Sequence, residues 1–491
     1  VTINIAASAF TDAAGNGNTV ATQFDWTHDV TAPSMTISTG AVADAGNYNA
    51  AVTLTLTAGQ ATTNFAIGDV SATGTGDCTL SSWNAQSTTV YTVICTPDGE
   101  GTVVTQVAAG TFTDAAGNSN TISNEYNWIH DVTDPVLNSA TTAGGTKKIG
   151  DVVTVTVAAD AAGYTLSAGT VNGVAVAGFN DAGGGSYTMT YTVVSGNTDR
   201  GAGETPISIV FTDSAGNTNN AITSLTESSA LVIDANAPTA TTSATITGGT
   251  AKVGTVITVT VVASEQSLTC TSCTMNGVTL ASWTNSATNT YTATYTVVEG
   301  NTDRAAGATP LSLTLTDAAG NSNAEYTTLT ESAAQTIDAN SPAATTSVTG
   351  GTDSLGVGDT ITLTIVASEA SLSCSTCTMN GGTLTNFQNT VGSTYTGVYT
   401  VAEGQTDRAA GASDFVSIVL SDAAGNTNSA FTTLTESGGA ITIDANTPVI
   451  SSATVAGSTA KVGSAITLTV VADAAGYTLS SGTLNAVAVT G

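Results

Sequence analysis

A phrase of five residues recurs along this chain at nearly constant spacing. It has the form Asp-X-Ala-Gly-Asn and starts at Asp12, Asp114, Asp213, Asp317 and Asp422, so successive copies lie 102, 99, 104 and 105 residues apart. This period exceeds the roughly 20–50 residues of a solenoid repeat and matches the size of one small domain. The sequence therefore predicts a tandem array of similar domains.

A second phrase, which ends in proline, keeps the same spacing. Asp-Val-Thr-X-Pro begins at Asp29 and Asp131, and Ile-Asp-Ala-Asn-X-Pro begins at Ile233, Ile337 and Ile443. Proline restricts the backbone, and no Gly/Ser linker follows, so we expect short, stiff connections. Together the phrases predict whole domains at residues 33–134, 135–237, 238–341 and 342–447. Residues 1–32 should be the C-terminal strands and 448–491 the N-terminal strands of partial domains, as expected for a segment of a longer protein.

Within each copy, apolar and polar residues alternate with a period of two. Examples begin at Val152, Val256 and Ile361, and further Thr- and Tyr-rich stretches begin at Ser186 and Thr290. Alternation of this kind marks half-buried strands, and Gly, Asn and Asp clusters separate them every 8–15 residues. About seven short strands per copy, with no sustained helical period, predict an all-β fold of antiparallel sandwiches.

The composition excludes several functions. Only 9% of residues are charged, and 7 Lys and Arg against 37 Asp and Glu give a net charge of −30. Such a chain has no basic surface for nucleic acid or for an anionic membrane. No apolar run approaches the roughly 20 residues of a membrane-spanning helix, and no signal peptide opens the chain. No catalytic set of residues stands out, so we expect no enzyme activity.

The two phrases in register resemble the tandem bacterial immunoglobulin-like (Ig-like) domains of large surface adhesins and biofilm-associated proteins. The resemblance covers essentially the whole chain and implies an extracellular location at the cell surface. It says little about what the array binds, because Ig-like sandwiches carry many unrelated functions.

The repeated phrases have a structural and a functional interpretation. Asp can accept backbone N–H bonds of the following turn, and Gly supplies the positive φ of that turn. Alternatively, the oxygens could bind Ca²⁺, which requires six to eight of them. The resemblance associates these aspartates with Ca²⁺ near domain junctions. The candidate structural Ca²⁺ sets are Asp12, Asn16 and Asp29; Asp114, Asn118 and Asp131; Asp213, Asn217 and Asp234; Asp317, Asn321 and Asp338; Asp422, Asn426 and Asp444.

Six cysteines are predicted to pair within domains. A bridge between Cys78 and Cys95 would close a loop of about 18 residues and add ~3 kcal/mol to stability in the chain-entropy model. Two Cys-X-X-Cys pairs, Cys270 with Cys273 and Cys374 with Cys377, occupy equivalent positions in successive copies. Redox and zinc roles are disfavoured because no helix or fourth ligand accompanies them. Structural disulfides indicate an oxidising compartment outside the cytoplasm.

The remaining polar residues receive structural interpretations. His28 and His130 occupy one repeat position beside tryptophans, which predicts packing at a strand end. Arg200, Arg304 and Arg408 each follow an aspartate and are expected to pin a loop by ion pairing. Lys148, Lys252 and Lys461 are aligned in a turn, where an isopeptide bond was considered and disfavoured.

These observations predict a stalk or fibre segment of a long secreted surface protein, which spaces a distal binding region from the cell. The alternative is a self-assembling extracellular filament, sheath or surface layer, which low surface charge would favour. A carbohydrate-binding module ranks last, because aromatic residues are only 5% of the chain. The expected partners are neighbouring copies of the protein itself or other cell-surface components.

Overall fold

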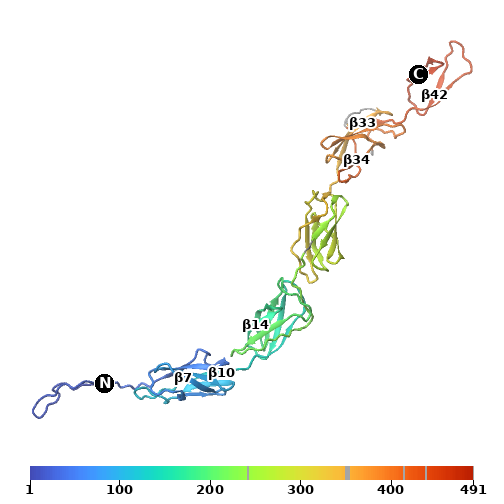
Figure 1. The fold of residues 1–491 in the computed structure, drawn as a ribbon. Helices are drawn as coiled ribbons and strands as arrows, with labels where there is room; N and C mark the ends of the chain where they lie inside the picture. The colour runs from blue at the N-terminus through green and yellow to red at the C-terminus, as the bar shows by residue number, and fades with distance from the viewer. Residues whose placement is uncertain (240–242, 349–353, 413–414, 437–439, 490–491) are drawn as a thin grey trace. The chain divides into compact units, whose positions relative to one another are not determined.

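The computed structural model describes residues 1–491 except 240–242, 349–353, 413–414, 437–439 and 490–491. The regular secondary structure of the described residues consists of strands, as predicted, apart from one short 3₁₀ helix, η1 (Ile67–Asp69). The chain forms two compact units, residues 1–237 with 319–321 and residues 238–318 with 322–491. Figure 1 shows the strands gathered into successive sandwiches.

The sandwich within residues 33–134 has two four-stranded sheets, ordered β3-β5-β8-β7 and β4-β10-β9-β6. Alternation of buried apolar and exposed polar residues, as along β5, places one face of each sheet in the core. The strands are β3 (Met35–Ser38), β4 (Gly46–Tyr48), β5 (Val52–Ala58), β6 (Val70–Thr73), β7 (Cys78–Ala85), β8 (Val90–Pro97), β9 (Gly101–Val107) and β10 (Tyr126–His130).

The next three sandwiches share a different arrangement. In residues 135–237 a five-stranded sheet, β16-β17-β13-β11-β19, faces a three-stranded sheet, β15-β14-β18, and β12 pairs with β20. The strands are β11 (Leu137–Thr142), β12 (Gly145–Lys147), β13 (Val152–Ala159), β14 (Thr165–Val171), β15 (Val174–Ala175), β16 (Ala177–Gly183), β17 (Ser186–Thr192), β18 (Ile207–Thr212), β19 (Thr226–Glu227) and β20 (Leu231–Ile233).

The same sheet orders recur twice in the second unit. Residues 238–341 contain β21 (Ser243–Ile246), β22 (Gly249–Lys252), β23 (Val256–Val262), β24 (Thr269–Met275), β25 (Val278–Thr279), β26 (Ala281–Ala287), β27 (Thr290–Thr296), β28 (Leu311–Thr316), β29 (Thr330–Glu331) and β30 (Gln335–Asp338). Residues 342–447 contain β31 (Ala344–Val348), β32 (Ser354–Leu355), β33 (Thr360–Ala367), β34 (Ser373–Met379), β35 (Gly382–Thr383), β36 (Thr385–Val391), β37 (Thr394–Thr400), β38 (Val416–Ser421), β39 (Thr435–Glu436) and β40 (Thr442–Ile443).

Most strand pairs are antiparallel, as predicted, but a few short pairs are parallel. Short parallel pairs join the first strands of a copy to its last ones, as between β12 and β20 and between β22 and β30. In each of these sandwiches the first strand is interrupted. Its second part, which is β12 or β22, runs parallel to the final strand, which is β20 or β30. Alternation within one strand carries no information about the direction of its neighbour.

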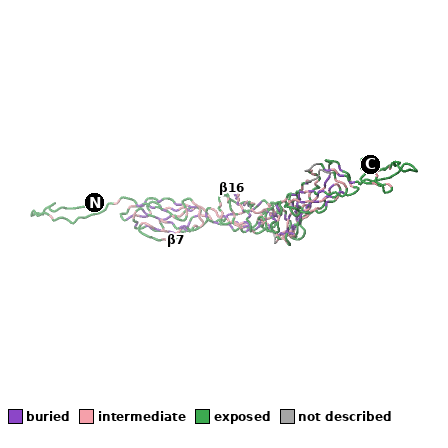
Figure 2. The backbone as a smooth tube through the Cα atoms, turned by 90° about the horizontal axis from the view of Figure 1, so that it is seen from above, coloured by how far each residue is buried: buried purple, intermediate pink, exposed green. Residues whose placement is uncertain are grey.

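Four separate hydrophobic cores fill the sandwiches. Their buried members fall within residues 35–128, 140–235, 244–339 and 361–445. Figure 2 shows these buried residues inside the sandwiches, whereas residues 1–32 and 449–489 are mainly exposed. The latter segments carry β1 (Thr2–Ile3), β2 (Phe24–Asp25), β41 (Ile450–Val455), β42 (Leu468–Ala472), β43 (Thr483–Leu484) and β44 (Val487–Ala488).

Candidate functional site at the domain junctions

The aspartate that opens the repeated phrase organises its own turn. In residues 213–217, Asp213 Oδ1 accepts backbone N–H bonds from Ala215 (2.9 Å), Gly216 (2.8 Å) and Asn217 (2.9 Å). The other oxygen, Oδ2, accepts from Asn217 Nδ2 at 2.9 Å. Gly216 has a φ of +99°, which explains why glycine stands there. The carboxylate is thus used by the turn itself, as the structural interpretation predicted.

The same bonds occur in other copies. The asparagine side chain donates to its aspartate in the turns beginning at Asp12 (3.1 Å), Asp114 (2.9 Å) and Asp422 (2.9 Å). These bonds favour the ionised carboxylate. The backbone N–H of Asn16 has the largest effect in lowering the pKa of Asp12, and the side chain of Asn118 has the largest effect in lowering that of Asp114.

The aspartate of the proline phrase also forms a local turn. Its Oδ1 accepts the backbone N–H two residues later, as Asp131 does from Thr133 (3.0 Å) and Asp338 from Asn340 (3.4 Å). Asp29, Asp234 and Asp444 accept the equivalent bonds at 2.9, 3.3 and 3.3 Å. This Asx turn fixes the chain just before the proline.

The structure groups the candidate residues differently from the predicted sets. We use the term junction asparagine for the last residue of each repeated phrase: Asn16, Asn118, Asn217, Asn321 and Asn426. Four of them donate from Nδ2 to the carbonyl of the aspartate in the preceding proline phrase: Asn118 to Asp29 (3.2 Å), Asn217 to Asp131 (2.9 Å), Asn321 to Asp234 (3.2 Å) and Asn426 to Asp338 (3.1 Å).

In this grouping, each proline-phrase aspartate contacts the junction asparagine of the next copy, whereas the predicted sets placed it with the asparagine of its own copy. Asp131 was grouped with Asp114 and Asn118, but it contacts Asn217, and Asp338 likewise contacts Asn426. The reason is that the proline phrase ends one domain, so its carbonyl faces the turn of the next domain. Among the described residues, no hydrogen bond joins Asn16 to Asp29 or Asn426 to Asp444.

The placement of these aspartates and asparagines can be compared with the oxygen ligands that Ca²⁺ requires. Among the described residues, no three His, Cys, Asp or Glu side chains lie close enough to hold one metal ion. Ca²⁺ requires six to eight oxygens, but the carboxylates already accept N–H bonds within their turns. The junction asparagine presents its N–H group, rather than its oxygen, to the aspartate carbonyl. As placed, these residues fit a hydrogen-bonded junction better than an oxygen cage.

The N–H groups that donate to the side-chain oxygen of the junction asparagine were not predicted from the sequence. Its Oδ1 accepts from Asn49 Nδ2 in the case of Asn217 (3.0 Å), and from the backbone N–H of Ile149 and Val253 in the case of Asn321 (2.8 Å) and Asn426 (2.7 Å). Ile149 and Val253 each follow one of the aligned lysines, Lys148 and Lys252. The alignment of that turn was the available signal.

The structure contains all three predicted disulfides. Cα–Cα distances are 5.5 Å for Cys78–Cys95, 6.0 Å for Cys270–Cys273 and 5.9 Å for Cys374–Cys377. In a regular strand, residues three apart face opposite sides. The register shifts between Cys270 and Ser272, and again between Cys374 and Thr376, so a bulge lies inside each Cys-X-X-Cys pair. The extra residue lets both cysteines point to the same side.

Among the described residues, the expected ion pairing is found at Arg408, whereas Arg200 and Arg304 form hydrogen bonds. Asp199 Oδ1 accepts from the backbone N–H of Ala235 (2.8 Å), and Arg200 Nε donates to Asn172 Oδ1 (2.8 Å). Asp303 and Arg304 repeat this pattern, whereas Arg408 pairs with Glu436 at 2.5 Å. The aspartate therefore supports the proline phrase and the arginine supports a nearby loop.

One of the two histidines, His130, lies at a strand end, as predicted, whereas His28 lies three residues after β2 (Phe24–Asp25). His130 is the last residue of β10, and its Nδ1 lies 2.8 Å from the carbonyl oxygen of Gly99. The ring of His28 packs edge-on against Trp26, with ring centroids 5.8 Å apart.

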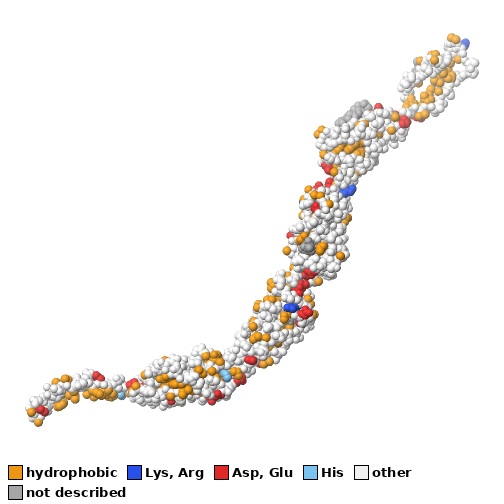
Figure 3. All heavy atoms as spheres, viewed as in Figure 1, with side chains coloured by type: hydrophobic (Ala, Val, Ile, Leu, Met, Phe, Trp, Pro, Cys, Tyr) orange, Lys and Arg blue, Asp and Glu red, His pale blue; other side chains and the backbone are white. Residues whose placement is uncertain are grey.

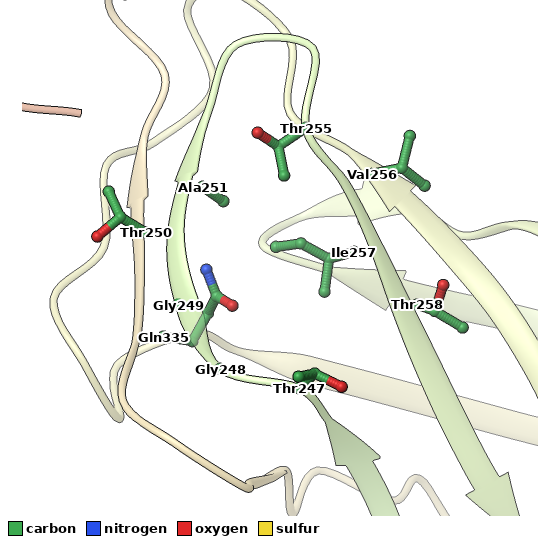
Figure 4. A pocket seen from close by; sticks show the side chains of 10 residues that line it. All are labelled: Thr247, Gly248, Gly249, Thr250, Ala251, Thr255, Val256, Ile257, Thr258 and Gln335. Carbon is green, nitrogen blue, oxygen red and sulfur yellow. The ribbon is translucent and has the colours of Figure 1, made fainter. Parts of the chain in front are cut away.

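A hollow of about 260 Å³ lies between β22, β30 and the start of β23. Figure 4 shows that Thr, Gly, Ala, Val and Ile residues and Gln335 line it. The Gln335 side chain already donates to the carbonyl of Thr336 at 2.7 Å. No acidic or basic side chain lines this hollow, so its walls offer none of the ionisable groups that general acid–base chemistry uses.

Among the described residues, no helix has the length and apolar character needed to cross a membrane.

Several solved structures resemble the chain at low identity. The titin I-band fragment I67–I69 is 10% identical, with a TM-score of 0.30, and the match covers 64% of this chain and 100% of that one. FdeC, an Escherichia coli adhesin, is 16% identical with a TM-score of 0.24 over 64% and 97%. Invasin, a bacterial integrin-binding protein, is 13% identical with a TM-score of 0.19 over 79% and 76%. These likenesses carry no conclusion about a ligand.

No curated protein sequence matches the chain. A family model described as a bacterial Ig-like domain matches residues 29–129 and 338–438. These regions fall in sandwiches with different sheet orders, so the family match spans both arrangements. Over these two regions, the chain is similar to bacterial Ig-like domains.

Proposed function

We propose that this chain is a structural stalk segment of a long secreted bacterial cell-surface protein, and that it spaces a distal adhesive region from the cell. The observation that carries the proposal is the series of four sandwiches with separate hydrophobic cores. A domain that contains its own core adds length without depending on the rest of the chain. Repetition of such domains suits a spacer, because reach then grows with copy number.

The three disulfides support a location outside the cytoplasm. Cys78–Cys95 joins neighbouring strands, and the two Cys-X-X-Cys bridges lie within single strands. Structural disulfides persist in oxidising compartments and are rare in reducing ones.

Surface labelling tests the location and the spacing role together. Antibodies raised against the purified chain should label intact cells that produce the protein, before any permeabilisation. Removing the domain at residues 135–237 from the full protein should bring a label on its distal end closer to the cell, as seen by electron microscopy. Labelling only after permeabilisation, or an unchanged label position, would reject the stalk.

The second candidate is lateral self-assembly into a filament, sheath or surface layer. The outer faces of the larger sheets favour it, because uncharged threonines lie opposite one another across strands. In β23 and β27, Thr258 faces Thr294 and Thr260 faces Thr292. Figure 3 shows only scattered acidic and basic side chains on the visible face. Copies of the chain would meet little charge repulsion there. Electron microscopy of the purified chain would show ordered polymers for assembly and isolated molecules for a stalk.

A further inference from the structure

We propose that each junction asparagine clamps its domain directly to the preceding domain through its side-chain amide, without a bridging cation. The proposal concerns two neighbouring domains of one chain, and it holds whether the whole protein is a stalk or a filament subunit. Two junctions each lie within a single structural unit, and the proposal rests on these two.

The first junction joins residues 33–134 to residues 135–237. Asn217 donates to the carbonyl of Asp131 (2.9 Å) and accepts from Asn49 Nδ2 (3.0 Å), so both ends of its amide reach the preceding domain. Beside it, Asn47 Nδ2 donates to Ser214 Oγ at 2.7 Å. Asn217 is only 7% exposed. The turn therefore contacts the preceding domain through two of its own side chains, Ser214 and Asn217.

The second junction joins residues 238–341 to residues 342–447 and repeats the pattern. Asn426 is 3% exposed, donates to the carbonyl of Asp338 (3.1 Å) and accepts the backbone N–H of Val253 (2.7 Å). Lys252 Nζ also donates to the carbonyl of Gly425 at 2.7 Å. An ideal Cβ on Gly425 would lie 3.3 Å from this Nζ, so glycine permits the close approach.

The amide leaves no role for a cation at its own position. In both junctions its nitrogen donates to the aspartate carbonyl and to the carboxylate of its own turn, and its oxygen accepts an N–H group. A buried amide needs such partners, because loss of one leaves a polar group without water. At the second junction, the ammonium group of Lys252 also supplies positive charge. Hydrogen bonds thus satisfy the groups that a calcium ion would otherwise bridge.

The test measures the distance between two domains in the full 491-residue chain. Spin labels are placed at two exposed strand positions, Thr57 and Thr154, through a ketone-bearing amino acid so that the disulfides remain intact. Double electron–electron resonance then gives the distribution of label distances, with added Ca²⁺ and with a chelator. We expect one narrow distribution that is the same in both conditions.

Variants then remove each side of the clamp. Asn49→Ala removes the donor on the preceding domain and does not change the repeated turn. Asn217→Ala removes the junction asparagine to which Asn49 donates. Each should broaden the distribution, and the double variant should broaden it no further. Asn84→Ala, which changes an exposed residue of β7, is the matched control and should leave the distribution narrow. Fluorescence of the buried Trp128 reports that the preceding domain remains folded.

Asn217→Asp separates the clamp from calcium binding. Aspartate keeps an acceptor for Asn49 but replaces the donor to Asp131 by a carboxylate oxygen. The clamp therefore predicts a broad distribution with and without Ca²⁺, whereas a calcium site predicts narrowing on Ca²⁺ addition. Unchanged distributions in both alanine variants, or a wild-type distribution that is narrow only with Ca²⁺, would overturn the proposal.

Discussion

At the residue scale, the repeated phrase acts mainly through hydrogen bonds to its own backbone. The sequence predicted that aspartate would accept N–H bonds of the turn and that glycine would take a positive φ, and Asp213 and Gly216 do so. These features were predictable because they depend on residues within one turn. The partner of the junction asparagine was not, because Asn217 and Asp131 are 86 residues apart and meet only after two domains have folded.

Replacing Asp213 with alanine should destabilise the domain at residues 135–237. The change removes the acceptor of three backbone N–H bonds and of the Asn217 side chain. Hydrogen bonds to a charged group are worth about 1.5–3 kcal/mol, and we expect a loss of that size in the free energy of unfolding. Chemical denaturation measures it. Asp134→Ala, at an exposed position, is the control, and an equal loss in both variants would contradict the role of the turn.

The lowered pKa of Asp114 predicts acid sensitivity. Asn118 and the turn amides favour the ionised carboxylate in the folded state, so the folded pKa lies below the ordinary value of 3.8. Its stabilising effect is therefore complete above pH 3.8 and is lost as pH falls through the folded pKa.

Calorimetry of the wild type and of Asp114→Asn across this range isolates the effect, because the other carboxylates are common to both chains. The stability difference between the two should shrink as the pH falls below 3.8. A difference that stays constant with pH would show that ionisation of Asp114 does not contribute.

At the element scale, strands were predictable but their irregularities were not. Alternation located β13 (Val152–Ala159), β23 (Val256–Val262) and β27 (Thr290–Thr296) closely. The bulge within each Cys-X-X-Cys pair could not be predicted from the sequence, because a bulge is defined by the register against a partner strand. Residues Leu166 to Ala168 carry the same shift in a domain without cysteines. The bulge therefore belongs to the shared fold, and the disulfides exploit it.

Reduction should affect the domains unequally. The Cys78–Cys95 bridge spans 17 residues and the Cys270–Cys273 bridge spans 3. In the chain-entropy model these loops are worth about 3 and about 2 kcal/mol respectively. Native-state hydrogen exchange with and without a reducing agent can follow each domain separately. The domain at residues 135–237 contains no cysteine and is the internal control. Equal loss of protection in all domains would contradict this ranking.

At the scale of the whole molecule, the sequence period predicted repetition, and four separate cores are present. The different sheet orders of the first sandwich and the next three were not predicted. The sequence did contain two groups of motifs, but the choice of edge strand depends on packing between sheets. Separate cores imply that each domain can unfold while its neighbours remain folded.

Pulling the chain from its two ends should therefore produce four unfolding events. A domain of about 100 residues releases roughly 35 nm of extended chain, less its folded length. The Cys78–Cys95 bridge holds 17 residues out of the extended path, so one event should be about 6 nm shorter than that of the cysteine-free domain. The two Cys-X-X-Cys bridges each hold 3 residues and should shorten their events by only about 1 nm.

A reducing agent should restore the short event to full length and leave the cysteine-free domain unchanged. This pattern would assign one event to the domain at residues 33–134 without any added marker, because the Cys78–Cys95 bridge hides a longer segment than the two Cys-X-X-Cys bridges. A single cooperative event for several domains would contradict separate cores, and equal lengths before reduction would contradict the Cys78–Cys95 bridge. A stalk is extended under load, so for the proposed stalk function the same measurement gives the force at which each domain would unfold in use.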